Sequence, residues 1–186
     1  PITEEELLTM VEEAQTEGGI DEEQSELIQN AIEFNDLDAW DVLTPRVDIM
    51  AIEIDETEEE VEKMFLETGF SRIPVYEENI DNVVGIFHVK DMVKCLVTED
   101  SDFKESFKLN DILMKPFFVP FSKKTDELFE EMQKNKIHMA IVIDEYGGTL
   151  GIVTMEDILE ELVGEIWDEH DEVIEMFHEI NPNLYK

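Results

Sequence analysis

A threonine and an aspartate three positions apart, Thr154 and Asp157, are the side chains best suited to ligand chemistry. They follow the apolar run Gly151 to Val153, typical of a strand, and precede an apolar periodic segment typical of a helix. At a helix start, such a pair can form a capping box that satisfies free backbone amides. The exposed helix N-terminus can instead receive an anionic or hydroxylated ligand, with Thr154 donating to a phosphate and Asp157 accepting from ribose hydroxyls. The spacing alone leaves both interpretations open.

These two residues belong to the second copy of an internal repeat. The stretch SRIPVYEE at 71–78 matches HMAIVIDE at 138–145 in its apolar positions, and GIFHVKD at 85–91 matches GIVTMED at 151–157. The segments that follow end alike, in Leu96-Val97 and Leu162-Val163. Repeated units of this kind bury their apolar faces against one another. We therefore predict two similar halves that pack together.

Both halves are predicted to have the element order β-α-β-β-α. In the first, we expect a strand at 47–52, a helix from the capping box of Thr57 and Glu60 to Gly69, strands at 73–76 and 83–87 joined by a turn at 79–82, and a helix at 89–97. In the second, we expect a strand at 117–119, a helix from Thr125, strands at 139–143 and 150–153 joined by a glycine turn at 145–148, and a helix from Thr154.

The organisation along the chain follows from these elements, and the fold class is α/β (mixed α+β). Residues 1–40 are acidic and predict two helices separated by Gly18-Gly19. We assign 41–98 to the first repeat, 99–110 to a polar linker, 111–166 to the second repeat and 167–186 to an acidic tail that leads to a further domain. The start at Pro1 and the abrupt end at Lys186 suggest a piece of a longer protein.

Four longer motifs narrow the interpretation to one family. They are VLTPR at 42–46, SRIPV at 71–75, HMAIVIDEYGG at 138–148 and TMEDILEELVGEI at 154–166. With the paired repeats, they resemble a Bateman module of two CBS (cystathionine-β-synthase-type) domains. They are most similar to the CorC/HlyC/TlyC haemolysin-like proteins, relatives of the CNNM magnesium transporters. The resemblance covers about residues 21–171 and implies two repeats packed about a pseudo-two-fold axis.

The resemblance also implies a ligand and a site. Modules of this family bind ATP with Mg²⁺, or AMP in some members, and regulate the efflux of divalent cations such as magnesium and cobalt. The carried-over nucleotide site comprises Thr44, Ser71, Arg72, Ile73, Pro74, Thr154, Glu156 and Asp157. A guanidinium at position 72 suits phosphate oxygens, although a surface ion pair would also explain Arg72. Because the protein is strongly acidic, we expect Mg²⁺ to neutralise the phosphates.

A second, pseudo-symmetric cleft is expected to be degenerate. It would use His88 and Asp91 in place of Thr154 and Asp157, with Val119, His138 and Met139 opposite them. His138 is taken to stand where Arg72 stands, and a histidine is largely neutral at pH 7. We expect this cleft to bind nucleotide weakly or not at all.

The family resemblance further implies a homodimer of CBS pairs on the cytoplasmic face of a membrane, with a membrane domain elsewhere in the same chain. The alternative from the residues is a CBS-fold dimerisation scaffold that binds no nucleotide. An enzyme is not expected, because no nucleophile with a base and no phosphate-binding loop is present. Neither a signal peptide nor an apolar run of the ~18–20 residues that span a bilayer is visible.

The composition limits the partners. Thirteen basic against 49 acidic residues give a net charge of −36, which would repel nucleic acid. The acidity serves solubility or salt adaptation, or attracts divalent cations. No protein side chains are assigned as metal ligands; His170 in its acidic stretch is interpreted as solvated rather than metal-binding. The single Cys95 is interpreted as a buried thiol rather than a reactive one, as in a reducing compartment.

Overall fold

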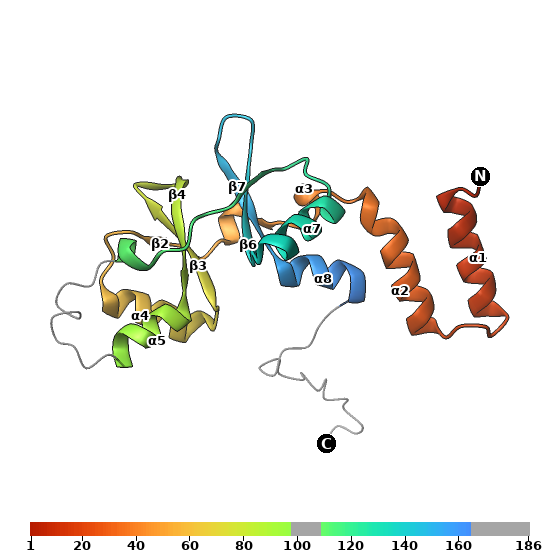
Figure 1. Cartoon of the computed structure of the whole chain (residues 1–186), viewed down its shortest axis with the longest axis horizontal. Helices are drawn as coiled ribbons and strands as arrows, with labels where there is room; N and C mark the ends of the chain where they lie inside the picture. Colours follow the sequence, from red (N-terminus) through yellow and green to blue (C-terminus); the bar gives the residue numbers. More distant parts are fainter. Residues whose placement is uncertain (98–108, 165–186) are drawn as a thin grey trace, which may run out of the picture.

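The computed structural model describes residues 1–97 and 109–164. Two repeats, each with a small sheet and its helices, lie side by side, and two further helices extend from the second repeat at one end of the molecule (Figure 1). The mixed α and β architecture and the paired repeats confirm the predicted fold class. The predictions for most of the linker, for the 167–186 tail, for the Cys95 side chain and for His170 lie outside the described residues.

The first repeat contains β2 (Ile52–Glu53), α4 (Glu58–Thr68), β3 (Arg72–Glu77), β4 (Asn79–His88) and α5 (Val89–Val97). Its strand order is β2-β3-β4, with β2 parallel and β4 antiparallel to β3. The predicted capping box starts α4, because the Glu60 amide donates to Thr57 Oγ1 at 3.3 Å and the Thr57 amide donates to Glu60 Oε2 at 3.0 Å. Gly69 ends the helix in the left-handed region at φ 67°.

The second repeat has the same order of elements. A 3₁₀ turn η3 (Leu109–Ile112) leads to β5 (Phe118–Pro120), α7 (Thr125–Asn135), β6 (Met139–Ile143), β7 (Thr149–Thr154) and α8 (Met155–Val163). Here β5 is parallel and β7 antiparallel to β6. The helix starts and strands match the predicted positions to within a residue, because clear apolar periodicity and caps mark them.

The two repeats exchange their entry segments. Before the first repeat, β1 (Thr44–Pro45) pairs with β7 of the second repeat, so that Thr44 lies opposite Ile152. Before the second repeat, Met114 pairs with Ile86 in β4 of the first. The side chains follow the same exchange: Ala39 packs in the core of the second repeat and Leu109 in the core of the first. Each entry segment thus completes the opposite half, which the sequence did not indicate.

A third apolar cluster joins the halves to each other. Val83 and Ile86 of β4 pack with Met139, Ile141 and Ile152 of the second sheet. Burial of side chains of this size contributes about 1.5–3 kcal/mol each. This shared cluster holds β4 of the first sheet against β6 and β7 of the second, beside the site described below.

A polar contact supplements this interface. Arg46, in the short 3₁₀ turn η2 (Arg46–Asp48), forms an ion pair with Asp81 of β4. The same Asp81 carboxylate accepts a hydrogen bond from the backbone amide of Thr149 in β7 at 2.9 Å. These two contacts hold the pKa of Asp81 below its usual range. The tip of the first hairpin is thereby tied to the second repeat.

The acidic N-terminal region forms the two predicted helices, α1 (Glu4–Thr16) and α2 (Glu22–Glu33), followed by the 3₁₀ turn η1 (Phe34–Asp36) and α3 (Ala39–Val42). Thr3 and Asp21 cap the two long helices, each in a capping box. Asn30 of α2 donates to the Leu162 carbonyl of α8 at 3.4 Å, so α2 is anchored on the second repeat. By contrast, α1 has no buried residue and packs mainly along α2 (Figure 1).

Two element predictions are wrong. The strand expected at 47–52 is replaced by η2 and the two-residue β2, because the chain must turn from the second sheet to the first at this point. The turn expected at 79–82 occurs instead at Glu78, whose φ of 66° reverses the chain, and β4 already begins at Asn79. Polar residues in a strand with a register shift resemble a turn in the sequence. No helix within residues 1–97 and 109–164 has the length and apolar character of a bilayer span.

Candidate functional site

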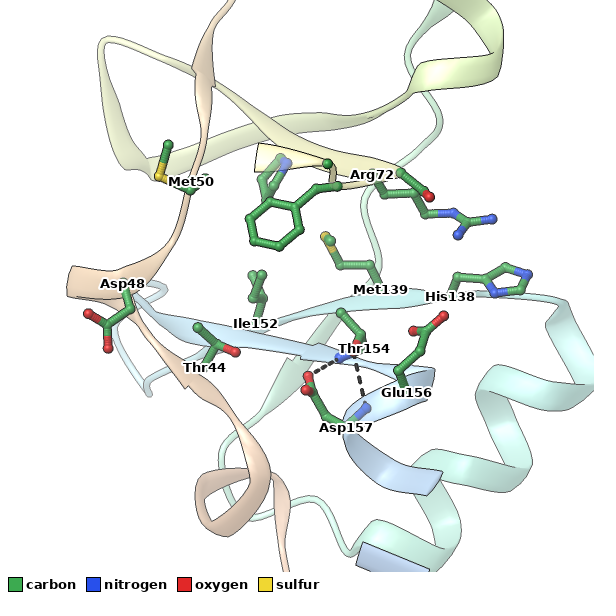
Figure 2. A pocket seen from close by; sticks show the side chains of 14 residues that line it. Thr44, Asp48, Met50, Arg72, His138, Met139, Ile152, Thr154, Glu156 and Asp157 are labelled. Atoms are coloured by element: carbon green, nitrogen blue, oxygen red, sulfur yellow. Dashed lines mark hydrogen bonds between the residues drawn. The ribbon is translucent and has the colours of Figure 1, made fainter. Parts of the chain in front are cut away.

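A cavity of about 370 Å³ lies between the two repeats, with the start of β3 on one side and β7 with the start of α8 on the other. Residues of both halves line it, as Figure 2 shows for ten labelled side chains. The lining residues are Thr44, Asp48, Met50, Gly69, Phe70, Ser71, Arg72, Pro74, His138, Met139, Ile152, Thr154, Glu156 and Asp157. The exchange of entry segments is what brings Thr44 next to the strand that carries Thr154.

One wall is the start of α8, where Thr154 and Asp157 form a capping box. The Asp157 amide donates to Thr154 Oγ1 at 3.2 Å, and the Thr154 amide donates to Asp157 Oδ2 at 2.8 Å (Figure 2). Both side chains also line the cavity. The Thr154 hydroxyl hydrogen and the second Asp157 oxygen have no partner among the described residues. The two interpretations drawn from the sequence are therefore compatible, since capping leaves one donor and one acceptor for a ligand.

The opposite wall is the start of β3, with Arg72 and Pro74, and the two residues before it, Phe70 and Ser71. Phe70 is 52% exposed and presents an open aromatic surface to the cavity. In Figure 2, the guanidinium of Arg72 and the imidazole of His138 lie on the same side of the cavity, away from Thr44 and Asp48. Within the described part of the chain, Arg72 forms no ion pair. Its charge is therefore available to a ligand.

Basic groups gather at this corner. Burial lowers the pKa of His88, and the nearby charges of Arg72, Lys90 and His138 lower it further, while Asp91 opposes them. An additional positive charge is thus unfavourable beside Arg72. In a protein of net charge −36, such a corner is a local attraction for anions.

Seven of the eight residues predicted for the nucleotide site line this cavity: Thr44, Ser71, Arg72, Pro74, Thr154, Glu156 and Asp157. Ile73 does not, because its side chain is fully buried in the core of the first repeat. Side chains alternate along a strand, so Arg72 and Pro74 face the cavity while Ile73 faces the core. Phe70 and Ile152 lie two positions from Arg72 and Thr154, so the same alternation could have predicted that they face the cavity. The sequence gives no comparable signal for Asp48 and Met50.

His138 and Met139, which we expected in the second cleft, line the same cavity as Thr154. The strand register corrects their alignment. Met139 lies opposite Thr154 as Arg72 lies opposite His88, so Met139 and not His138 is the counterpart of Arg72. The equivalence of His138 with Arg72 was therefore wrong by one residue, whereas the alignment of 71–78 with 138–145 already pairs Arg72 with Met139.

The remaining residues of the predicted second cleft already have partners. The Nδ1 atom of His88 accepts a hydrogen bond from the Lys90 amide at 2.9 Å, and Asp91 pairs with Lys94 at 2.9 Å. Val119 is 3% exposed. In place of the Thr154–Asp157 box, the helix α5 thus starts with a histidine cap and an ion pair. The arrangement leaves fewer free groups for a ligand than the start of α8 does.

Comparisons with known proteins agree with this architecture of two repeats. The family model for the CBS domain matches residues 39–98 and 109–164. The chain is 42% identical over 171 residues to a chloroplastic DUF21 domain-containing protein of Arabidopsis thaliana. It is 34% identical over 172 residues to the magnesium and cobalt efflux protein CorC of Escherichia coli.

Solved structures narrow the family. The CBS domain of a bacterial CNNM/CorC family Mg²⁺ transporter, in complex with ATP, is 38% identical, with a TM-score of 0.71 over 77% of this chain and 99% of that one. A CBS-domain pair from Klebsiella pneumoniae with bound AMP is 27% identical, with a TM-score of 0.60 over 69% of this chain and 99% of that one. The chain therefore belongs to the CBS-domain family, as a tandem pair of the CNNM/CorC type. It spans 26% of the Arabidopsis protein and 58% of the E. coli protein.

Proposed function

We propose that this CBS pair is an adenine-nucleotide-sensing regulatory module of a membrane protein that exports divalent cations such as Mg²⁺ and Co²⁺. The observation that carries the proposal is the inter-repeat cavity, in which an unpaired Arg72 faces the free groups of Thr154 and Asp157. Its volume of about 370 Å³ lies within the range of roughly 300–1,000 Å³ typical of small-molecule sites. The ATP complex of the similar CNNM/CorC domain supports the same class of ligand.

The lining residues suit the parts of a nucleotide. Phe70, Pro74 and Met139 offer apolar surface to adenine, and the Asp157 carboxylate can accept from ribose hydroxyls. Arg72 and His138 can donate to phosphate oxygens at the cationic corner. Mg²⁺ would arrive with the phosphates, because it is usually held by substrate phosphates together with few protein carboxylates. Glu156, which lies beside His138 in Figure 2, is the acidic residue of the lining best placed for this role.

The regulatory part of the proposal follows from the position of the site between the two repeats. A nucleotide that contacts both repeats favours one relative arrangement of them, and a ligand can shift an equilibrium by its difference in affinity for the two states. The E. coli relative named for magnesium and cobalt efflux supports a transport protein as the whole chain. We place this module on the cytoplasmic side of that protein. ATP or AMP occupancy would then adjust the transport activity.

Calorimetric titration with ATP, with and without Mg²⁺, tests the proposal. We expect saturable binding at millimolar ATP or below, and a loss of about 10- to 100-fold in affinity for Arg72→Gln, since a hydrogen bond to a charged group contributes about 1.5–3 kcal/mol. Lys63→Gln is the matched control: it removes the same charge from the exposed face of α4, where Lys63 only pairs with Glu67. Absence of heat at millimolar ATP would contradict nucleotide sensing, and equal losses in both variants would contradict the site.

The alternative function, a dimerisation scaffold, also has an observation in its favour. Large apolar side chains on the outer faces of α4 and α5 are exposed, with Leu66 at 80%, Val97 at 74% and Val93 at 52%. Such a surface suits association with a second copy of the chain. If light scattering shows a dimer that Leu66→Asp disrupts, while ATP fails to bind the parent, the scaffold is the better description.

A further inference from the structure

A second cavity, of about 390 Å³, lies away from the inter-repeat cleft and shares no residue with it. Trp40 of α3 and Phe121, which follows β5, form its aromatic part, with ring centroids 6.5 Å apart and planes at 77°. The Trp40 amide donates to the Phe121 carbonyl at 3.1 Å, so the two rings are held by the backbone. Trp40 nevertheless remains 57% exposed and Phe121 38% exposed. Aromatic side chains that only fill a core are usually more buried than these two rings.

The other lining residues are carboxylates and one leucine: Asp38, Asp144, Glu145 and Leu150. The Asp144 carboxylate is held in place, because its Oδ1 atom accepts from the Tyr146 amide at 2.9 Å and the Gly148 amide at 2.8 Å. Among the described residues, no Lys or Arg lines the cavity. The neighbouring ammonium groups contact other atoms, Lys123 with Glu127 and Glu131, and Lys124 with the Asp36 carbonyl. The cavity is therefore aromatic and negatively charged.

We propose that this Trp40–Phe121 cavity docks a basic segment of a partner protein by accepting an arginine side chain. A guanidinium can stack on the indole of Trp40 while it donates to a carboxylate of the rim, and its aliphatic stem can lie on Leu150. An anionic occupant would be repelled by the three carboxylates, and a purely apolar one would leave them without a charged partner.

The composition argues against a second copy of this chain as the occupant. The chain has only two arginines, Arg46 and Arg72. Arg46 is engaged with Asp81, and Arg72 lines the inter-repeat cavity. A partner with basic residues also gains from the attraction of this strongly acidic chain.

The test uses a fluorescein-labelled peptide, Gly-Arg-Gly-Arg-Gly, and its citrulline counterpart, which keeps the shape but lacks the charge. Fluorescence anisotropy is recorded in 150 mM NaCl, where screening weakens general attraction beyond about 8 Å. We expect saturable binding of the arginine peptide, at least tenfold weaker binding of the citrulline peptide, and at least a fivefold loss for Trp40→Ala. That variant leaves every carboxylate in place, so its loss reports the aromatic corner rather than net charge.

Two matched controls address folding and charge. Leu66→Ala removes an exposed apolar side chain from α4, and Glu62→Gln removes an exposed carboxylate from the same helix; both should bind like the parent. Glu145→Gln should weaken binding about threefold or more. Circular dichroism melting shows whether Trp40→Ala is folded, and Trp40→Leu, which keeps the apolar bulk, replaces it if it is not. Equal binding by both tryptophan variants and the parent, equal binding of the two peptides, or a dimer that Trp40→Ala dissociates would each overturn the proposal.

Discussion

Thr154 and Asp157 each perform two tasks at the same position. Their backbone and side-chain atoms exchange two hydrogen bonds that start α8, and both side chains line the inter-repeat cavity. A capping box therefore does not exclude a ligand site, because the hydroxyl hydrogen of Thr154 and one Asp157 oxygen stay free for the cavity. Substitutions here must separate the loss of a helix cap from the loss of a ligand contact.

Asp157→Asn makes that separation. The asparagine oxygen can still accept from the Thr154 amide, so the helix start is retained, while the negative charge that would accept from ribose hydroxyls is lost. We expect about a tenfold loss of ATP affinity in calorimetry, with little change in thermal stability. Asp157→Ala should lose the cap as well, at about 0.5–2 kcal/mol.

The matched control is Asp21→Asn, which changes the same residue type in the capping box of α2, away from the cavity. It should leave ATP binding unchanged. If Asp157→Ala binds ATP as tightly as the parent, Asp157 is not a ligand contact.

His88 makes stability depend on pH. Burial and the charges of Arg72, Lys90 and His138 lower its folded pKa below the usual 6.5, and Asp91 only partly offsets them. Between the folded pKa and 6.5, the unfolded chain binds more protons, so stability falls as the pH decreases through this window. His88→Asn, whose oxygen can accept from the Lys90 amide, should reduce the loss of unfolding free energy between pH 7.5 and 5.5. Identical urea unfolding profiles of parent and variant at both pH values would contradict this assignment.

At the scale of elements, two glycines permit the exchange of entry segments. A Cβ on Gly151 would lie 2.3 Å from the Thr44 carbonyl oxygen, and one on Gly85 would lie 2.7 Å from Leu113 Cβ. Both glycines stand at the same place in their repeats, where an entry segment crosses the last strand. Their repetition in the sequence thus reflects close approach of the backbone rather than a turn.

Gly151→Ala should therefore separate β1 from β7. The new methyl group meets backbone atoms that cannot move aside, so we expect a cost of about 3 kcal/mol in unfolding free energy. ATP binding should weaken too, because Thr44 is displaced from the cavity. Gly147→Ala is the comparison: its Cβ meets nothing within 4 Å, and only its φ of 83° is unfavourable, at about 1 kcal/mol. Equal costs for the two variants would show that the close approach is unimportant.

Local signals in the sequence predicted most elements but not their connections. The caps at Thr57 and Thr154 and the glycine turn before β7 were predicted correctly, because a few neighbouring residues determine them. The exchange of entry segments pairs residues that are distant in the sequence, Ile86 with Met114 and Thr44 with Ile152, and leaves no local pattern.

The candidate site was predictable for a related reason. Its residues lie at strand ends and at a helix start, where short motifs are informative, and seven of eight predicted residues line one cavity. The misplacement of Ile73 concerns which face of a strand a residue occupies. Strands that are apolar on both faces do not reveal this in their sequence.

At the scale of the whole molecule, few of the carboxylates behind the net charge of −36 are paired with a basic side chain. The ion pairs within the described residues involve Arg46, Lys63, Lys94 and Lys123, all on the surface, where such pairs contribute little. The remaining carboxylates repel one another and destabilise the folded chain. Among residues 1–97 and 109–164, no group of three or more His, Cys, Asp or Glu side chains is arranged to hold a metal ion.

Salt should therefore stabilise the protein through general screening. We expect the melting temperature to rise by several degrees between 20 and 300 mM NaCl, because the screening length falls and few favourable ion pairs are lost. MgCl₂ without nucleotide should act gradually over the millimolar range, as a more effective counterion and not as a bound ligand. Calorimetric scanning across both salt series measures this, with ATP added in a parallel series. A saturating increase at micromolar Mg²⁺ without ATP would instead show a specific cation site, and the acidity would then serve divalent binding rather than solubility.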